Sequence, residues 1–157
     1  MVVLEEITLI AAPIERCFDL SRSIDLHLVS TATTGEQAIA GVTSGLIRMG
    51  EQVTWRARHL LVTQEFTSKI TAFNEPYHFR DEMVRGAFRH FVHDHYFCGL
   101  PDGITEMKDV LRFSAPIPLL GQIAELFLKP YLSGFLRERN GILKRTCESQ
   151  EWQRFLS

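Results

Sequence analysis

Cysteine, long apolar runs and an excess of charge of one sign are all scarce in this 157-residue chain. The three cysteines, Cys17, Cys98 and Cys147, are widely spaced and odd in number. This argues against a disulfide framework or a zinc knuckle and predicts a reducing compartment, the cytoplasm. The net charge of -2 offers no general attraction to nucleic acid or to an anionic membrane. No stretch reaches the roughly 20 apolar residues that cross a bilayer, so we expect no membrane insertion.

Signals for targeting and for well-known chemistries are missing as well. The start, Met-Val-Val-Leu-Glu-Glu, has no basic segment followed by an apolar one, so we expect no secretory signal. The sequence contains no nucleophile elbow, phosphate-binding loop, dinucleotide fingerprint or nucleic-acid motif. With 45% hydrophobic and 23% charged residues and no linker, it reads as one globular domain over residues 1–157.

What is present is an alternation of apolar and polar residues through the middle of the chain. Val53, Trp55 and Ala57 share one face of a predicted strand, and Phe66 and Ile70 share one face of the next. This period of two predicts antiparallel strands with one covered and one solvated face. The predicted strands are 2–10, 52–60, 62–73, 77–84, 88–98 and 105–115, with a poorer one within 30–45.

Helices are predicted on either side of these strands. Pro13 suits the first turn of a helix over 14–20, and Ser21 or Ser23 can cap a second short helix over 24–28. A long helix is predicted after Pro118. Its first half is apolar nearly all the way round, so another element must cover it. Strands segregated from helices predict an α+β fold in which an antiparallel sheet covers the terminal helix.

These elements resemble the START-like, Bet v 1-like (SRPBCC) superfamily and, within it, bacterial proteins related to polyketide cyclases and dehydrases. The resemblance spans essentially the whole chain and is carried by PIERCF (13–18), VTWRAR (53–58), FRDEMVRG (79–86), FVHDHYF (91–97), MKD (107–109) and RERN (137–140). It implies a helix-grip fold, in which a curved antiparallel sheet of about seven strands wraps round a long C-terminal helix, with two short helices after the first strand. Members hold lipids, hormones or polyketides, as enzymes or as carriers, so fold alone does not give function.

The densest polar cluster lies on two neighbouring predicted strands. A hairpin loop over 99–103 pairs Phe91 with Leu111, His93 with Asp109, His95 with Met107 and Phe97 with Thr105. A buried carboxylate beside an imidazole suits general acid/base catalysis or a polar anchor, so His93 and Asp109 are candidate catalytic residues. Two alternatives stay open. The pair can be purely structural, and the covered face can instead be the one with His90 and Asp94.

The same cluster bears on metal binding. His93 and His95 are two apart on a strand and point the same way, and Asp109 could add a carboxylate, as in zinc or non-haem iron sites. The sequence has neither an H-E-x-x-H helix nor a Cys-x-x-Cys pair, and the superfamily that it resembles usually works without metal. We therefore predict no metal and no cofactor.

The candidate ligand-binding residues lie on the covered strand faces and on one stripe of the terminal helix. They are Trp55, Phe66, Phe79, Asp81, Met83, Phe91, His95, Met107, Phe113, Phe127, Tyr131 and Phe135. A packed core uses the same residue types, and the resemblance favours a lined cavity. The predicted inward stripe comprises Ile123, Phe127, Tyr131 and Phe135. A second stripe then faces the sheet rim, the short helices or another subunit, and comprises Leu120, Leu128, Leu132 and Leu136.

We expect a cytoplasmic binding protein for a hydrophobic small molecule such as a lipid, a polyketide or an aromatic compound. Two alternatives remain: a cyclase or dehydratase that uses His93 and Asp109 as an acid/base pair, and an interaction protein, a homodimer joined through the apolar helix. No nucleic-acid partner is expected.

Overall fold

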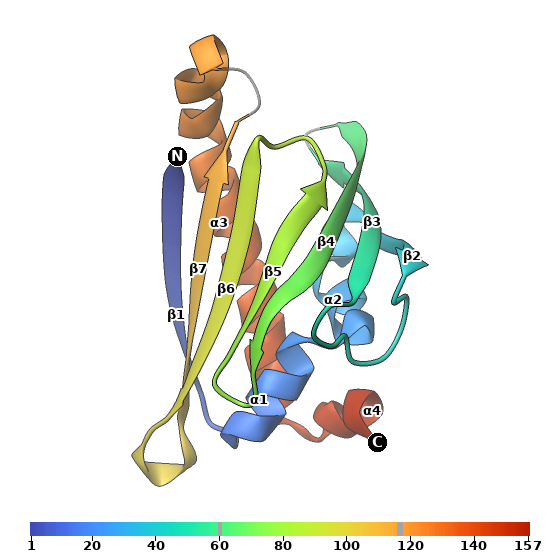
Figure 1. Cartoon of the computed structure of the whole chain (residues 1–157). Helices are drawn as coiled ribbons and strands as arrows, with labels where there is room; N and C mark the ends of the chain where they lie inside the picture. Colours follow the sequence, from blue (N-terminus) through green and yellow to red (C-terminus); the bar gives the residue numbers. More distant parts are fainter. Residues whose placement is uncertain (60, 116–117) are drawn as a thin grey trace.

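Seven strands form one antiparallel sheet in a computed structural model, which describes residues 1–59, 61–115 and 118–157, without the side chains of 118–122. The sheet order is β1-β7-β6-β5-β4-β3-β2 (Figure 1). The strands are β1 (Val2–Ile10), β2 (Gln37–Gly41), β3 (Gln52–His59), β4 (Val62–Asn74), β5 (His78–Arg85), β6 (His90–Gly99) and β7 (Thr105–Ser114). Each predicted strand is present, and the helix-grip architecture is confirmed.

The helices lie on one side of this sheet (Figure 1). Their bounds are α1 (Ile14–Ser21), α2 (Ile24–Ser30), α3 (Pro118–Glu148) and α4 (Gln153–Leu156). Ser23 caps α2 as predicted, because its Oγ accepts a hydrogen bond of 3.2 Å from the backbone N–H of Leu26. The long helix α3 ends at Glu148, before a short 3-10 turn and α4. Within the described part of the chain, no helix combines the length and the apolar character needed to span a bilayer.

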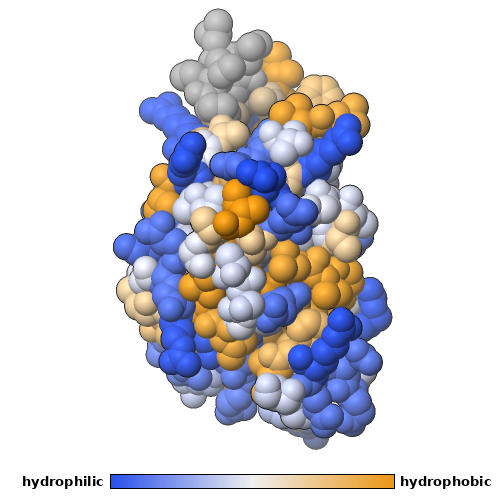
Figure 2. All heavy atoms as spheres, turned by 90° about the vertical axis from the view of Figure 1, so that its right-hand side faces the viewer, coloured by the Kyte–Doolittle hydropathy of each residue, from blue (hydrophilic) through white to orange (hydrophobic). Residues whose placement is uncertain are grey.

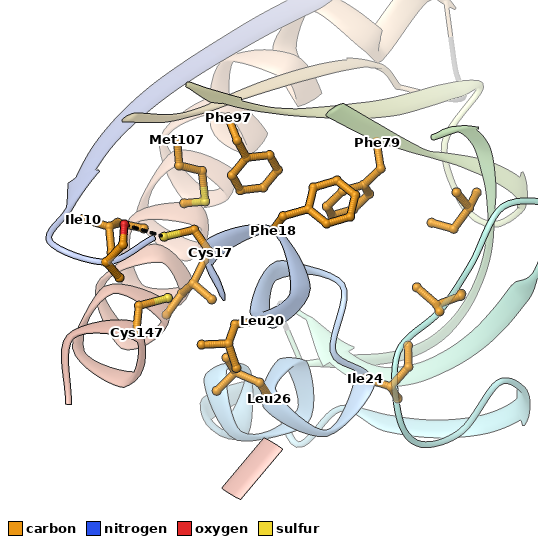
Figure 3. Close-up of a cluster of buried hydrophobic side chains, with 14 of the residues drawn as sticks. Ile10, Cys17, Phe18, Leu20, Ile24, Leu26, Phe79, Phe97, Met107 and Cys147 are labelled. Carbon is orange, nitrogen blue, oxygen red and sulfur yellow. Dashed lines mark hydrogen bonds between the residues drawn. The ribbon is translucent and has the colours of Figure 1, made fainter. Parts of the chain in front are cut away.

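One end of the space beneath the sheet is filled by a packed core. Phe18 points from α1 toward Phe79 and Phe97 on the sheet (Figure 3). Its ring meets theirs edge-to-face, with both pairs of ring centroids 5.5 Å apart. Met107 and Cys147 are fully buried in the same cluster, so α1, the sheet and the end of α3 are fixed together here.

The predicted register of the β6–β7 hairpin is wrong by two residues. His93 lies opposite Leu111 and His95 opposite Asp109. The strand β6 continues to Gly99, and the backbone N–H of Leu100 donates a hydrogen bond of 2.7 Å to the carbonyl of Ile104, so the loop starts one residue later than expected. A shift of two keeps every side chain on its predicted face, and His93 and His95 therefore still point to the covered side.

The predicted inward stripe of α3 is wrong in its first half. Ile123 and Phe127 are 57% and 70% exposed. The side chains that turn toward the sheet recur at spacings of three and four residues, as on the apolar face of an amphipathic helix. They are Leu128, Tyr131, Leu132, Phe135, Leu136 and Arg139. An i, i+4 series drifts round the helix by about 40° per step, so a series centred on Tyr131 and Phe135 leaves the buried face within two steps. Leu120 lies outside the described side chains.

Apolar side chains also reach the surface of the sheet edge. Figure 2 shows apolar side chains gathered within the face that forms the right-hand side of Figure 1, between hydrophilic ones. Ile39 of β2 and Val62 of β4 are exposed. Scattered exposed apolar groups are normal for a globular protein, so they alone identify no site.

Candidate functional site

A partly open cavity of about 380 Å³ lies between the sheet and α3, beside the packed core. Its wall is largely apolar and comes from α2, β3, β4, β5, β6 and the middle of α3. Its volume falls within the range of about 300–1,000 Å³ that is typical of small-molecule sites. The space beneath the sheet thus contains both a packed core and a cavity.

Most of the predicted ligand-binding residues line this cavity. These are Trp55, Phe66, Phe79, Asp81, Phe91, His95, Tyr131 and Phe135, together with the candidate catalytic His93. Leu128, Leu132 and Leu136, which were assigned to the second stripe of the helix, line it too. The cavity wall therefore includes members of both predicted helix stripes.

Four predicted ligand-binding residues lie away from the cavity wall. Met107 is fully buried in the packed core, and Phe113 packs with Leu4 and Leu111 in a separate cluster. Met83 packs against Gly86 at the end of its strand, and Phe127 is exposed. Alternation along the strands assigned Met83, Met107 and Phe113 inward, and it does not say where along a strand the core ends and the cavity begins. Phe127 was assigned by the i, i+4 stripe of the helix, which leaves the buried face.

Two histidines and two aspartates form a polar cluster at the inner wall, which we call the histidine–aspartate cluster: Asp81, His93, His95 and Asp109. Oδ1 of Asp109 accepts a hydrogen bond of 2.9 Å from Nε2 of His93 and lies 2.8 Å from Nδ1 of His95. Nδ1 of His95 makes no hydrogen bond, so this second contact is electrostatic. Oδ2 of Asp109 accepts a hydrogen bond of 2.7 Å from Asn140 on α3.

Asp81 faces the other side of both rings. Its Oδ2 lies 3.0 Å from Nε2 of His95 and 4.0 Å from Nδ1 of His93. The rings of the two histidines lie against each other, with centroids 3.9 Å apart. Asp81, His93 and His95 line the cavity, whereas Asp109 lies behind them and is fully buried. The cluster therefore presents one carboxylate and two imidazoles to a ligand.

Burial and the contacts among its members together set the charges of this cluster. Burial raises the pKa of Asp109, but the contacts from His93 and His95 outweigh it and hold that pKa well below its usual range. Burial lowers the pKa of His93, and the nearby charge of His95 lowers it further. Burial also lowers the pKa of His95, yet the Asp109 and Asp81 carboxylates reverse this and raise it. Near neutral pH the carboxylates are ionised and the positive charge favours His95 over His93.

A second polar group, the Glu36 cluster (His27, Glu36, His59 and Tyr131), lines another part of the cavity. Oε2 of Glu36 lies 2.6 Å from Nε2 of His27, and Oε1 lies 3.6 Å from Nε2 of His59. His59 is hydrogen-bonded through Nδ1 to the hydroxyl of Tyr131 on α3, at 2.8 Å. Burial raises the pKa of Glu36, but hydrogen bonds from the two histidines outweigh it and lower the pKa to about 2.

Sequence reasoning missed the Glu36 cluster except for Tyr131. Its members come from α2, the segment before β2, the end of β3 and α3, so no local spacing joins them. Only one feature of the sequence pointed to this cluster: a tyrosine on an inward helix face needs a hydrogen-bond partner. In the structure that partner is His59.

The alternative covered face of β6 carries a cluster of a different kind. Asp94 is fully buried on the face away from α3 and accepts hydrogen bonds from Arg80 and Arg112, with His78 2.7 Å away. Both arginine side chains are about one third exposed. The contacts are among side chains of the sheet itself, so Asp94 ties the outer face of β5, β6 and β7 together and does not belong to the cavity.

A curved seven-stranded antiparallel sheet round a long C-terminal helix, with a cavity between them, defines the helix-grip class of α+β domains. Comparison with solved structures identifies the fold as START/Bet v 1-like. The protein TTHA0849 from Thermus thermophilus is 14% identical, with 92% of this chain and 95% of that chain covered and a TM-score of 0.74. No protein-family model and no curated protein sequence matches the chain.

Two further structures carry the fold names. A START superfamily protein from Mycobacterium smegmatis is 11% identical, covers 91% of this chain and 97% of its own, and has a TM-score of 0.68. Ara h 8.0201 is 16% identical, covers 90% and 97%, and has a TM-score of 0.60. At these identities the likeness establishes the fold, and function must be argued from the site.

Proposed function

We propose that this protein binds a hydrophobic small molecule in the cavity between the sheet and α3. The observation that carries the proposal is a largely apolar cavity of about 380 Å³ with two separate polar clusters in its wall. The histidine–aspartate cluster lies on β5, β6 and β7 and the Glu36 cluster touches β3, with β4 between them in the sheet. An apolar body fits between the two clusters, and its polar groups face one or both of them.

The energetic basis is burial of apolar surface. Trp55, Phe66 and Phe135 supply broad apolar wall area, and each Å² of apolar surface removed from water contributes about 25 cal/mol. A polar end group that entered such a wall without a partner would cost free energy. Asp81 and His95 on one side and Tyr131 on the other offer hydrogen-bond partners, so an amphipathic ligand is favoured over a pure hydrocarbon.

The proposal is tested by replacing a small residue of the cavity wall with a large one that occupies the cavity. Ala57 is buried on β3 and lines the cavity, while Arg58 next to it is exposed on the other face. Ala57→Phe places a ring in the cavity, and Arg58→Phe adds the same ring outside. Binding of an environment-sensitive apolar dye, displaced by unlabelled fatty acids and by polycyclic aromatic compounds, is measured for both variants.

We expect Ala57→Phe to weaken dye binding by at least about 10-fold, since a steric conflict of about 1.4 kcal/mol suffices for that factor. Arg58→Phe should bind as the wild type does. Thermal unfolding of each variant checks that it is folded. Equal dye affinity in all three proteins would mean that the dye binds elsewhere and would refute the proposal.

A second function, acid/base catalysis on a polyketide-like substrate, is favoured by one contact. His93 lines the cavity and is hydrogen-bonded at 2.9 Å to the fully buried Asp109. A base held in this way can take a proton from carbon next to a carbonyl and return it to the leaving hydroxyl, as a cyclase or dehydratase requires. His93→Ala and Asp109→Asn should then abolish turnover of a β-hydroxyketone while the apolar dye still binds. Unchanged turnover in both variants would eliminate this function.

A further inference from the structure

The histidine–aspartate cluster contains three potential metal ligands, a combination that the sequence alone did not predict. The sequence supplied His93 and His95 with Asp109 as the third candidate, but Asp109 lies behind the rings. The carboxylate that faces the cavity side of both rings is Asp81, from β5. One oxygen of Asp81 and one ring nitrogen of each histidine all lie within 4.8 Å of one another.

The distances suit a shared ion. Ligand atoms about 2.1 Å from one metal ion are about 3.0 Å apart at a right angle and at most about 4.2 Å apart when opposite. Oδ2 of Asp81 is 3.0 Å from Nε2 of His95 and 4.0 Å from Nδ1 of His93. Both separations fall between those limits. The backbones of two adjacent strands, β5 and β6, therefore bring the three donors together.

Asp109 prepares the two rings for this role. An imidazole binds a metal through an unprotonated nitrogen, and a carboxylate on its other nitrogen holds the proton there. Asp109 contacts Nε2 of His93 at 2.9 Å and Nδ1 of His95 at 2.8 Å. These are the nitrogens remote from Asp81. Asp109 thus favours a proton on these two nitrogens, through a hydrogen bond at His93 and an electrostatic contact at His95, and leaves Nδ1 of His93 and Nε2 of His95 on the Asp81 side to bind a metal.

The carboxylate behind the rings is itself fixed. The amide of Asn140 donates to Oδ2 of Asp109 at 2.7 Å, and Arg139 contacts Asn140 at 3.3 Å. Asn140 and Asp109 are both buried. The orientation of the rings is thus set by an outer layer of hydrogen bonds from α3, which is the arrangement that supports metal ligands in other proteins.

We propose that Asp81, His93 and His95 bind one divalent first-row transition metal ion at the inner wall of the cavity. Two imidazoles and one carboxylate suit zinc or ferrous iron and leave coordination positions free for water or a ligand atom. All three residues line the cavity, so the free positions face the space that an apolar ligand would occupy. When the ion binds, it replaces the proton shared between His95 and Asp81, which is released to solvent. The site does not depend on which molecule fills the cavity.

The test uses the full chain after tag removal and dialysis against a chelator. Zinc binding is measured by isothermal titration calorimetry, and cobalt binding by the visible absorption of the Co²⁺ ion. The wild type should bind one equivalent of each. Asp81→Ala, His93→Ala and His95→Ala should each weaken zinc binding by at least about 100-fold, and Asp109→Asn by about 10- to 100-fold. His90→Ala is the matched control, because His90 is exposed on the same strand, and it should bind zinc as the wild type does.

A wild-type measurement guards against variants that do not fold. Crystals soaked in Zn²⁺ are examined by anomalous diffraction at the zinc edge. The expected peak lies within about 2.2 Å of Nδ1 of His93 and Nε2 of His95. A peak only at the Glu36 cluster or only on the surface would overturn the proposal, and so would the absence of saturable binding by the wild type at 100-micromolar concentrations. Zinc binding that is unchanged in Asp81→Ala would also overturn it.

Discussion

Phe18 lies in the packed core and Phe66 lies in the cavity wall, so truncation of each to alanine tests whether these two regions differ in packing. Phe18 on α1 is fully buried and meets Phe73, Phe79 and Phe97 edge-to-face at 5.3, 5.5 and 5.5 Å. Phe66 on β4 lines the cavity, is half-buried and meets one ring, Phe91, at 5.0 Å. The residue type and the atoms removed are the same in both variants, so only the surroundings differ.

The expected costs differ severalfold. Phe18→Ala removes a ring that is surrounded on all sides, and we expect it to lower the free energy of unfolding by about 3–5 kcal/mol. Edge-to-face ring pairs contribute about 0.5–1.5 kcal/mol each, so the loss of three places the result in the upper half of that range. Phe66→Ala enlarges a space that already exists and loses one ring pair. We expect a cost of about 1–2 kcal/mol.

Urea unfolding followed by circular dichroism measures both costs, and apolar dye binding is the second readout. Phe66→Ala should change dye affinity because it alters the cavity wall, whereas folded Phe18→Ala should bind dye like the wild type. Equal destabilisation by the two truncations would show that Phe66 is packed as tightly as Phe18. The division of the space beneath the sheet into core and cavity would then be wrong.

Three further outcomes are expected from urea titrations of single variants. Glu36→Gln should lower the free energy of unfolding by about 3 kcal/mol at pH 7, because the pKa of Glu36 is lowered from 4.5 to about 2. The ionised Glu36 contributes this stabilisation in full above pH 4.5. The difference in stability between wild type and variant should therefore vanish as the pH falls to about 2. An unchanged difference at pH 2 would contradict the assignment. Asp94→Asn should cost about 2 kcal/mol at pH 7 through its lost charge-assisted hydrogen bonds, and no loss would mean that the outer-face cluster is not stabilising. Gly45→Ala should lower the free energy of unfolding by roughly 1 kcal/mol, and Gly41→Ala should lower it by well over that amount. Both glycines have positive φ, but only at Gly41 would an added Cβ lie 2.2 Å from the Gln52 carbonyl oxygen. Equal losses in the two variants would refute this prediction.

The sequence predicted the fold well because its signals are local and repeated. Alternation along each strand predicts which face is covered, and Pro13 and Ser23 mark the starts of the two short helices. The order of elements then fixes one long helix against one sheet. The register of β6 with β7 was wrong because it depends on where a loop begins, and a shift of two residues leaves the alternation unchanged.

The candidate site was only partly predictable for a different reason. The alternation of side chains between the two faces of each strand identified His93, His95 and Asp109 as neighbours, and the structure brings all three together. It did not reveal that Asp109 lies behind the rings, nor did it place Asp81 in front of them, because that depends on side-chain directions across three strands. The Glu36 cluster joins four segments, and no pattern within one segment could assemble it.

The central claim, that the cavity holds an apolar small molecule, is tested most directly by native mass spectrometry of freshly purified wild type and Ala57→Phe. We predict that the wild type carries an additional mass of one small molecule per chain, which organic solvent extracts, and that Ala57→Phe carries none. A wild type that shows only the mass of the chain, even after incubation with the fatty acids and aromatic compounds of the dye assay, would contradict the account.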